Sequence, residues 1–161
     1  MWIKLDLDGL VFQLRISKYR LSKEDIWDEQ WCRVSCSIVD EKNKVINYHV
    51  SDNELLLCSE VEALTVAIEK LLNNEYSSKN ELEFIEPDYN LVLYPKCETG
   101  YISMEWKVNL WSDGLSANYF SVEFSKDELK TLFAYLKYII GEYKNDTPII
   151  KDMINTGILY G

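Results

Sequence analysis

The fold class of this chain is decided by its opening stretch, residues 3–16, which reads Ile3-Lys4-Leu5-Asp6-Leu7-Asp8-Gly9-Leu10-Val11-Phe12-Gln13-Leu14-Arg15-Ile16. Apolar and polar residues alternate on both sides of Asp8-Gly9. Alternation with a period of two is typical of strands that bury one face, and Asp-Gly between two such strands is a strong signal for a two-residue turn. The sequence therefore predicts an antiparallel β-hairpin at the start of the chain.

The rest of the first half extends this hairpin and ends in a helix. Residues 18–30 are polar and predict a loop, and residues 31–39 and 45–50 predict strands on either side of a turn. Residues 51–58 fit no pattern clearly. Ser59-Glu60-Val61-Glu62 is a capping box, in which the serine and Glu62 satisfy backbone N–H groups of a first helical turn. Apolar residues then follow at helical spacing, at Val61, Leu64, Ile68, Leu71 and Leu72.

The second half repeats this order of elements. Strands are predicted for residues 82–86, 91–94, 101–111 and 119–124, and the first of them stops at Glu86-Pro87-Asp88 because proline cannot donate to a ladder. A second capping box, from Ser125 to Glu128, opens a helix that extends to Ile140. A short helix is expected after Pro148.

The predicted fold class is therefore α+β, with mainly antiparallel strands and two capped helices. Each half contains about four strands followed by a helix, which suggests a duplicated ββββα unit with halves at 1–75 and 81–143 and a tail at 145–161. We expect residues 1–161 to form a single domain. The pattern leaves open whether the strands form one continuous sheet or two. Four aromatic residues are expected in the core: Phe12, Phe84, Trp106 and Phe133.

The charge of the chain points to a cationic protein partner. Its 161 residues carry a formal net charge of −10. Nucleic acid and anionic membranes are poor partners for such a chain, because both are bound through clustered Lys and Arg. No apolar run approaches the ~20 residues of a membrane-spanning helix, and the first residues do not form a signal peptide, so we expect a cytoplasmic protein. Opposite charge would steer a basic partner to it, and the alternative is that the net charge only keeps the protein soluble.

The four cysteines do not predict a metal site or a disulfide framework. In a cytosolic protein, Cys32, Cys36, Cys58 and Cys97 are expected to be reduced and buried. Cys32 and Cys36 are four residues apart on a predicted strand, which separates their thiols by roughly 13 Å, too far for one zinc ion. The single histidine, His49, lies within a predicted strand. Neither a metal nor a cofactor is expected.

Catalysis finds no support in the sequence. A Ser–His or Cys–His pair would need His49 beside a nucleophile, and the six glycines form no phosphate-binding loop. Paired carboxylates do occur, around Asp25 and around Glu83, but a chain with 27 acidic residues produces such clusters by chance. We therefore predict a protein that is not an enzyme.

The candidate binding residues are those where acidic and aromatic side chains coincide. Trp and Tyr are enriched at binding hot spots, and Trp27 lies within an acidic segment. The predicted partner-binding residues are Asp25, Trp27, Asp28, Glu29, Trp31, Glu86 and Asp88. The alternative is that both tryptophans cover the sheet and serve the core.

In order along the chain, these elements resemble the WapI-like family of small bacterial immunity proteins. The similar pieces cover roughly residues 10–140, and they are Asp25-Ile26-Trp27-Asp28-Glu29-Gln30-Trp31, the helix from Glu62 to Leu72, Leu82-Glu83-Phe84-Ile85-Glu86-Pro87-Asp88, and the strands and helix from Ile102 to Leu129. The resemblance implies neutralisation of a toxin domain, often a nuclease, by direct binding in the producer's cytosol. The alternatives are a non-catalytic interaction or oligomeric module, or an enzyme with an unrecognised carboxylate site.

Overall fold

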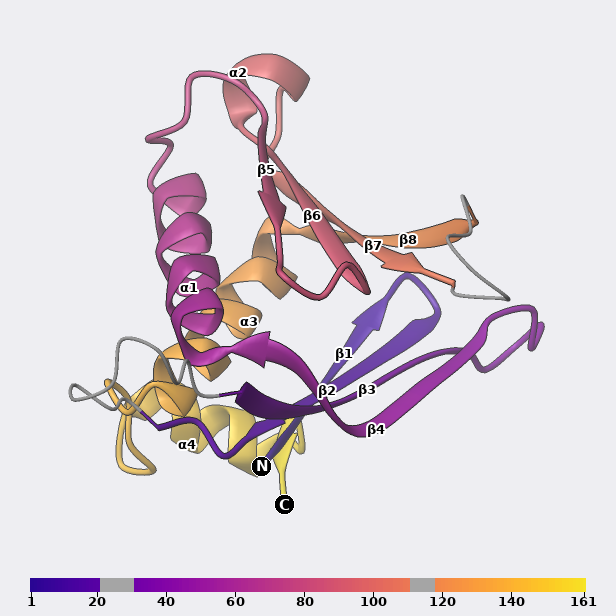
Figure 1. Ribbon diagram of the computed structural model, residues 1–161. Helices are drawn as coiled ribbons and strands as arrows, with labels where there is room; N and C mark the ends of the chain where they lie inside the picture. The colour runs from indigo at the N-terminus through magenta and orange to yellow at the C-terminus, as the bar shows by residue number, and fades with distance from the viewer. Residues whose placement is uncertain (21–30, 111–117) are drawn as a thin grey trace. The chain divides into compact units, whose positions relative to one another are not determined.

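The computed structural model describes residues 1–20, 31–110 and 118–161, and it divides into two compact units. The first unit joins Met1–Glu62 to Leu132–Gly161, and the second unit is Ala63–Thr131. One antiparallel sheet belongs to each unit (Figure 1). The predicted α+β class is confirmed, and the strands form two sheets.

The first sheet has the strand order β4-β3-β2-β1-β9. Its members are β1 (Trp2–Leu7), β2 (Leu10–Ser17), β3 (Trp31–Asp40), β4 (Asn47–Leu57) and β9 (Leu159–Tyr160). The predicted hairpin is confirmed by the pairing of β1 with β2. Its turn has φ angles of 58° at Asp8 and 94° at Gly9, as a type I′ turn requires. The Gly9 N–H also donates to Asp6 Oδ1 at 2.8 Å.

Strand β4 is longer than the predicted segment 45–50 and includes most of the stretch that fitted no pattern. It runs from Asn47 to Leu57. The β3–β4 register shifts twice, between Cys32 and Arg33 and between Val34 and Cys36. Such irregularities bend a strand and break the alternation of its side chains. The strand was missed at this point because its period is interrupted.

Helix α1 (Cys58–Leu72) begins one residue before the predicted capping box. The side chain that reaches back is Glu60, whose Oε2 accepts the Leu57 N–H at 2.8 Å. The predicted role of Glu62 is wrong, because its Oε1 accepts the Tyr19 hydroxyl at 2.7 Å. The helical spacing itself is confirmed, since Val61, Leu64, Ile68 and Leu71 are all buried and only Leu72 is half-buried.

The second sheet has the order β5-β6-β7-β8. Its members are β5 (Asn80–Glu83), β6 (Tyr89–Tyr94), β7 (Ser103–Asn109) and β8 (Tyr119–Ser125). A short helix that the sequence did not predict, α2 (Lys96–Thr99), connects β6 to β7. On the buried face, the Trp106 ring meets Tyr89 edge-on at 5.3 Å and lies 6.0 Å from Phe124.

The remaining helices are α3 (Lys126–Ile139) and α4 (Pro148–Asn155). The capping box predicted for α3 is supported by the Ser125 N–H, which donates to Glu128 Oε2 at 2.5 Å. The helix predicted after Pro148 is confirmed as α4. Strand β9 was not predicted, because a segment of two residues has no readable period.

Two expectations about the core need correction. Phe12 and Trp106 are fully buried, but Phe84 and Phe133 are only half-buried. Cys32, Cys36 and Cys58 are buried and reduced as expected, whereas Cys97 is exposed. Cys97 belongs to the short helix α2, none of whose residues is buried.

Each sheet's main strands are followed in sequence by a helix, as the repeat pattern predicted: β1 to β4 precede α1, and β5 to β8 precede α3. The duplication itself, with halves at 1–75 and 81–143, stays a prediction.

Candidate functional site

The predicted binding residues fall into three groups in the structure. Asp25, Trp27, Asp28 and Glu29 lie outside the described residues. Trp31 is the first residue of β3, in the first unit, where it is half-buried and lies opposite Leu57 of β4. Glu86 and Asp88 belong to the second unit.

The structure brings Glu86 and Asp88 together in one turn. The turn joins β5 to β6, and both acidic residues are half-buried in it. Asn109, at the end of β7, fixes its position: the Asn109 side-chain amide donates to the Pro87 carbonyl, and the Asn109 N–H donates to the Asp88 carbonyl at 2.9 Å. The two carboxylates are therefore carried by a turn whose backbone is hydrogen-bonded to the sheet.

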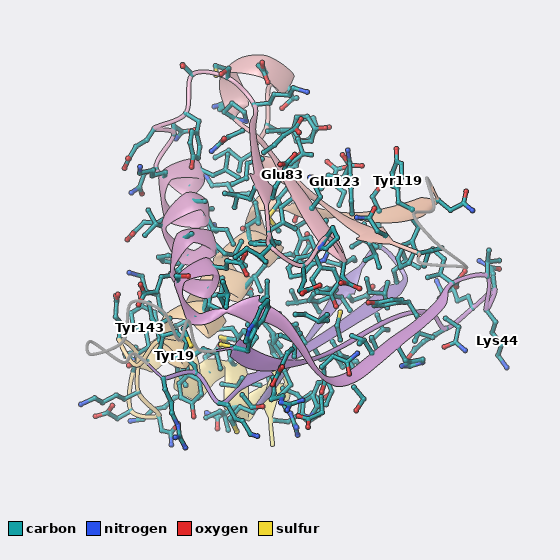
Figure 2. The ribbon with its side chains drawn as sticks, viewed as in Figure 1. Tyr19, Lys44, Glu83, Tyr119, Glu123 and Tyr143 are labelled. Atoms are coloured by element: carbon teal, nitrogen blue, oxygen red, sulfur yellow. The ribbon has the colours of Figure 1, made fainter. Side chains whose placement is uncertain are left out.

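A larger acidic surface, which we call the outer face, lies on the side of the second sheet opposite the buried rings. Cross-strand pairing places Glu81, Val92, Glu105 and Glu123 in one row, one residue from each strand. The neighbouring row contains Glu83, Asn90, Lys107 and Ser121. Glu83, Glu123 and Tyr119 are labelled along this sheet in Figure 2. Alternate residues of a strand point to opposite faces, so these rows share one face.

A groove of about 410 Å³ is sunk into the outer face and contains two of these carboxylates. We call it the Glu105–Glu123 groove, and its lining residues are Tyr94, Thr99, Tyr101, Ser103, Glu105, Ser121 and Glu123. Every one of these lining side chains carries a hydroxyl or a carboxylate. Tyr101 is 57% exposed, whereas Ser103 is 2% exposed and lies at the floor of the groove.

One polar contact inside the groove links its aromatic and acidic walls. The Tyr94 hydroxyl donates to Glu105 Oε2 at 3.3 Å. Burial raises the pKa of Tyr94, and the charge and hydrogen bond of Glu105 raise it further. The phenol therefore stays protonated and remains a hydrogen-bond donor at neutral pH.

The groove offers two carboxylates and several hydroxyl groups, which can bind a cation. The single histidine, His49, lies on β4 in the first unit, where it is exposed and sits 2.7 Å from Asn47 Oδ1. Within residues 1–20, 31–110 and 118–161, no three His, Cys, Asp or Glu side chains are placed to hold a metal ion. Two carboxylates among hydroxyl groups suit an ammonium or guanidinium group.

Sequence reasoning missed this groove although part of the signal was present. The alternation through residues 101–111 and 119–124 placed Glu105 and Glu123 on the polar faces of their strands. Their meeting depends on the β7–β8 register, which sets Glu105 directly opposite Glu123. The β7–β8 register could not be predicted from the sequence, because the length of the connection between two strands does not fix how their residues pair.

None of the helices in the described part of the chain combines the length and the apolar character needed to cross a membrane.

Comparisons with known proteins give one informative result. A search of curated proteins found no match. Three chains of solved structure match, including one described as "Structure of the plant transcriptional regulator PBF-2". That alignment covers 97% of this chain and 84% of that chain at 10% identity and a TM-score of 0.38, a value at which neither fold nor function follows.

The family comparison is more specific. Residues 3–144 match the family described as "Immunity protein WapI-like family". The match includes all four strands of the second sheet, four of the five strands of the first, and helices α1 to α3. This chain therefore belongs to the WapI-like family of immunity proteins.

Proposed function

We propose that this protein neutralises a cognate toxin by binding it directly in the cytosol of the bacterium that produces both. The observation that carries the proposal is the family match over residues 3–144. An immunity protein of this kind acts by occupying its partner and needs no chemistry of its own. We therefore propose a binding protein that is not an enzyme and requires no cofactor.

The charge of the chain supports a basic toxin, such as a nuclease domain. A nuclease surface binds phosphates through Lys and Arg, and the formal charge of −10 is its electrostatic complement. The acidity is concentrated in residues 63–131, which contain 12 acidic and six basic side chains and so hold −6 of the −10. This segment is the second unit, which carries the outer face.

The sequence-derived residues remain part of the proposed interface. Glu86 and Asp88 belong to the turn beside the second sheet, and Asp25, Trp27, Asp28, Glu29 and Trp31 form the other candidate region. The second candidate function is a non-catalytic interaction or oligomeric module without a toxin partner. Self-association at micromolar concentration would favour that function.

A rescue assay tests the proposal. The protein is co-expressed with a candidate toxin domain, taken from the C-terminus of any large secreted protein whose gene adjoins its own, and surviving cells are counted. Rescue, together with a purified complex that weakens as salt rises, is the expected result. The matched control is a toxin domain inactivated at its own catalytic residue, which should still form the complex. If both proteins are folded and expressed but neither rescue nor a complex appears, the proposed function is wrong.

A further inference from the structure

The outer face holds two like charges against each other. Glu105 and Glu123 are direct cross-strand partners on β7 and β8. Side chains in such positions have Cβ atoms about 5 Å apart, and like charges placed there destabilise the sheet. A sheet that only had to fold would gain stability from a neutral or basic residue at either position.

The described cations do not relieve this repulsion. Lys107 Nζ lies 3.9 Å from Glu105 Oε2, at the limit of an ion pair, and it also lies 5.5 Å from the centre of the Tyr119 ring. Lys79 pairs with Glu81 at 3.3 Å. Glu123 is exposed, and within the described part of the chain it has neither an ion pair nor a hydrogen bond. Among the described side chains, therefore, no cation is paired with Glu123.

The residues that line the groove indicate which kind of ligand it can bind. Pockets for small organic molecules are lined predominantly by apolar side chains. This groove is instead lined by carboxylates, hydroxyl groups and the rings of Tyr94 and Tyr101. A guanidinium group can donate hydrogen bonds to two carboxylates at once and stack on an aromatic ring. An arginine side chain could therefore bind both the carboxylates and the tyrosine rings that line the groove.

We propose that the outer face of β5–β8 is the surface that docks the toxin, and that the Glu105–Glu123 groove receives an arginine or lysine side chain of that toxin. The proposal rests on the proposed function and adds the surface and its chemistry. Charge complementarity is the argument, since the groove contains two carboxylates and lies in the more acidic of the two units. The like-charge pair is kept because the partner supplies the missing cation.

Two readouts test the proposal, and they move in opposite directions if it is right. The variant is E105Q/E123Q, which keeps side-chain shape and removes both charges. Its affinity for the toxin domain, measured by titration calorimetry at low salt, should fall about 100-fold, or about tenfold for each lost charged hydrogen-bond acceptor. Its thermal midpoint without toxin should rise, because the repulsion between the strands is gone.

The matched control is E41Q/D146N. It removes the same number of charges from exposed positions in the first unit, and neither residue has a contact to another described side chain through its carboxylate. Affinity in this control should change less than threefold. A similar loss of affinity in both double variants would mean that net charge alone matters, and it would overturn the groove as the docking site.

The remaining outcomes separate this proposal from the proposed function. If wild type rescues and binds but E105Q/E123Q binds equally well, immunity stands and the docking surface is wrong. Loss of binding in W27A/D28K alone would then place the interface at residues 25–29.

If E105Q/E123Q lowers the thermal midpoint, the carboxylates are structural and the proposal falls. Heat on titrating Mg²⁺ or Ca²⁺ into wild type but not into the variant would replace it with a metal site, and dimerisation lost in the variant would replace it with self-association. If wild type itself does not bind the toxin domain, both proposals fail.

Discussion

The buried hydroxyl of Tyr135 shows how one side chain can complete the hydrogen bonding at the end of a central strand. The Ile16 N–H, near the end of β2, donates to the Tyr135 hydroxyl at 2.9 Å. The same hydroxyl donates to the Met1 carbonyl at 3.3 Å. Tyr135 is fully buried, so no water replaces it. Helix α3, which carries Tyr135, thus supplies a hydrogen-bond acceptor for the buried Ile16 N–H.

Removing that hydroxyl should destabilise the protein measurably. Tyr135→Phe leaves the Ile16 N–H buried without its partner, which costs about 1–3 kcal/mol of unfolding free energy. Urea denaturation with an unchanged slope checks the value. Tyr143→Phe is the control, because Tyr143 is half-buried with no described hydroxyl contact, and it should change stability by less than about 0.5 kcal/mol. Equal effects in the two variants would remove this role from Tyr135.

Two tyrosines should make the fold sensitive to alkaline pH. Burial raises the pKa of Tyr135, and burial together with the hydrogen bond to Glu62 raises the pKa of Tyr19. In the unfolded chain tyrosines ionise near pH 10. At that pH Tyr135 and Tyr19 of the folded chain are still protonated, because their pKa values are raised. Unfolding then releases protons, so the unfolding free energy is intact below about pH 9 and falls as pH rises above 10. Tyr135→Phe should flatten this fall between about pH 9 and 11, measured by denaturation at each pH.

The exposed position of Cys97 predicts selective thiol chemistry. Its Sγ lies 3.3 Å from the Ser77 carbonyl, but the residue is exposed, whereas the other three thiols are buried. Burial also raises the pKa of Cys32, whose sulfur lies 3.5 Å from that of Cys58. One equivalent of maleimide should therefore react with the folded protein, and four after unfolding, as counted by mass spectrometry. Rapid labelling of folded Cys97→Ser would contradict this assignment.

At the scale of elements, the capping side chains decide where the helices begin. The Ser125 N–H donates to Glu128 Oε2, as the capping box predicted. Glu128→Ala should cost about 0.5–2 kcal/mol, because it leaves the N–H of Ser125, the residue before the helix, without its acceptor. Lys126→Ala, an exposed change in the same turn, should cost less than about 0.5 kcal/mol. Chemical denaturation of both variants measures the difference, and comparable losses would show that helix propensity dominates over the cap.

The two helix starts also show how far local sequence signals can be trusted. At α3 the observed contact is the glutamate half of the predicted box, from the Ser125 N–H to Glu128. At α1 the same kind of signal was misplaced by two residues: Glu60 accepts the Leu57 N–H, where Glu62 was expected to reach back to Ser59. Glu62 instead accepts the Tyr19 hydroxyl. Tyr19 lies 43 positions from Glu62, so no local window could include that competitor. Period-two alternation likewise predicted β1 and β2 closely and failed along β4, where the register shifts.

For the whole molecule, chain connectivity predicts cooperative unfolding. The chain passes from the first unit to the second within α1 and returns within α3, because the unit boundaries fall at Glu62–Ala63 and Thr131–Leu132. Each unit therefore contains one part of α1 and one part of α3, so unfolding either unit breaks both helices. We therefore expect one calorimetric transition, with calorimetric and van't Hoff enthalpies in agreement. Two separate transitions would contradict the single domain proposed for residues 1–161.

The sequence by itself determined the fold class, most of the strands, the main helices and the acidic character of the chain. These features depend on periodicity, turn residues and composition, which are local or additive. Tertiary structure decided which carboxylates meet. Glu105 and Glu123 are 18 positions apart and become neighbours only through the β7–β8 register, and Glu83 and Lys107 join the same face through β6. A binding surface is a set of such long-range neighbours, and pairing between strands, which no single stretch of sequence encodes, creates it.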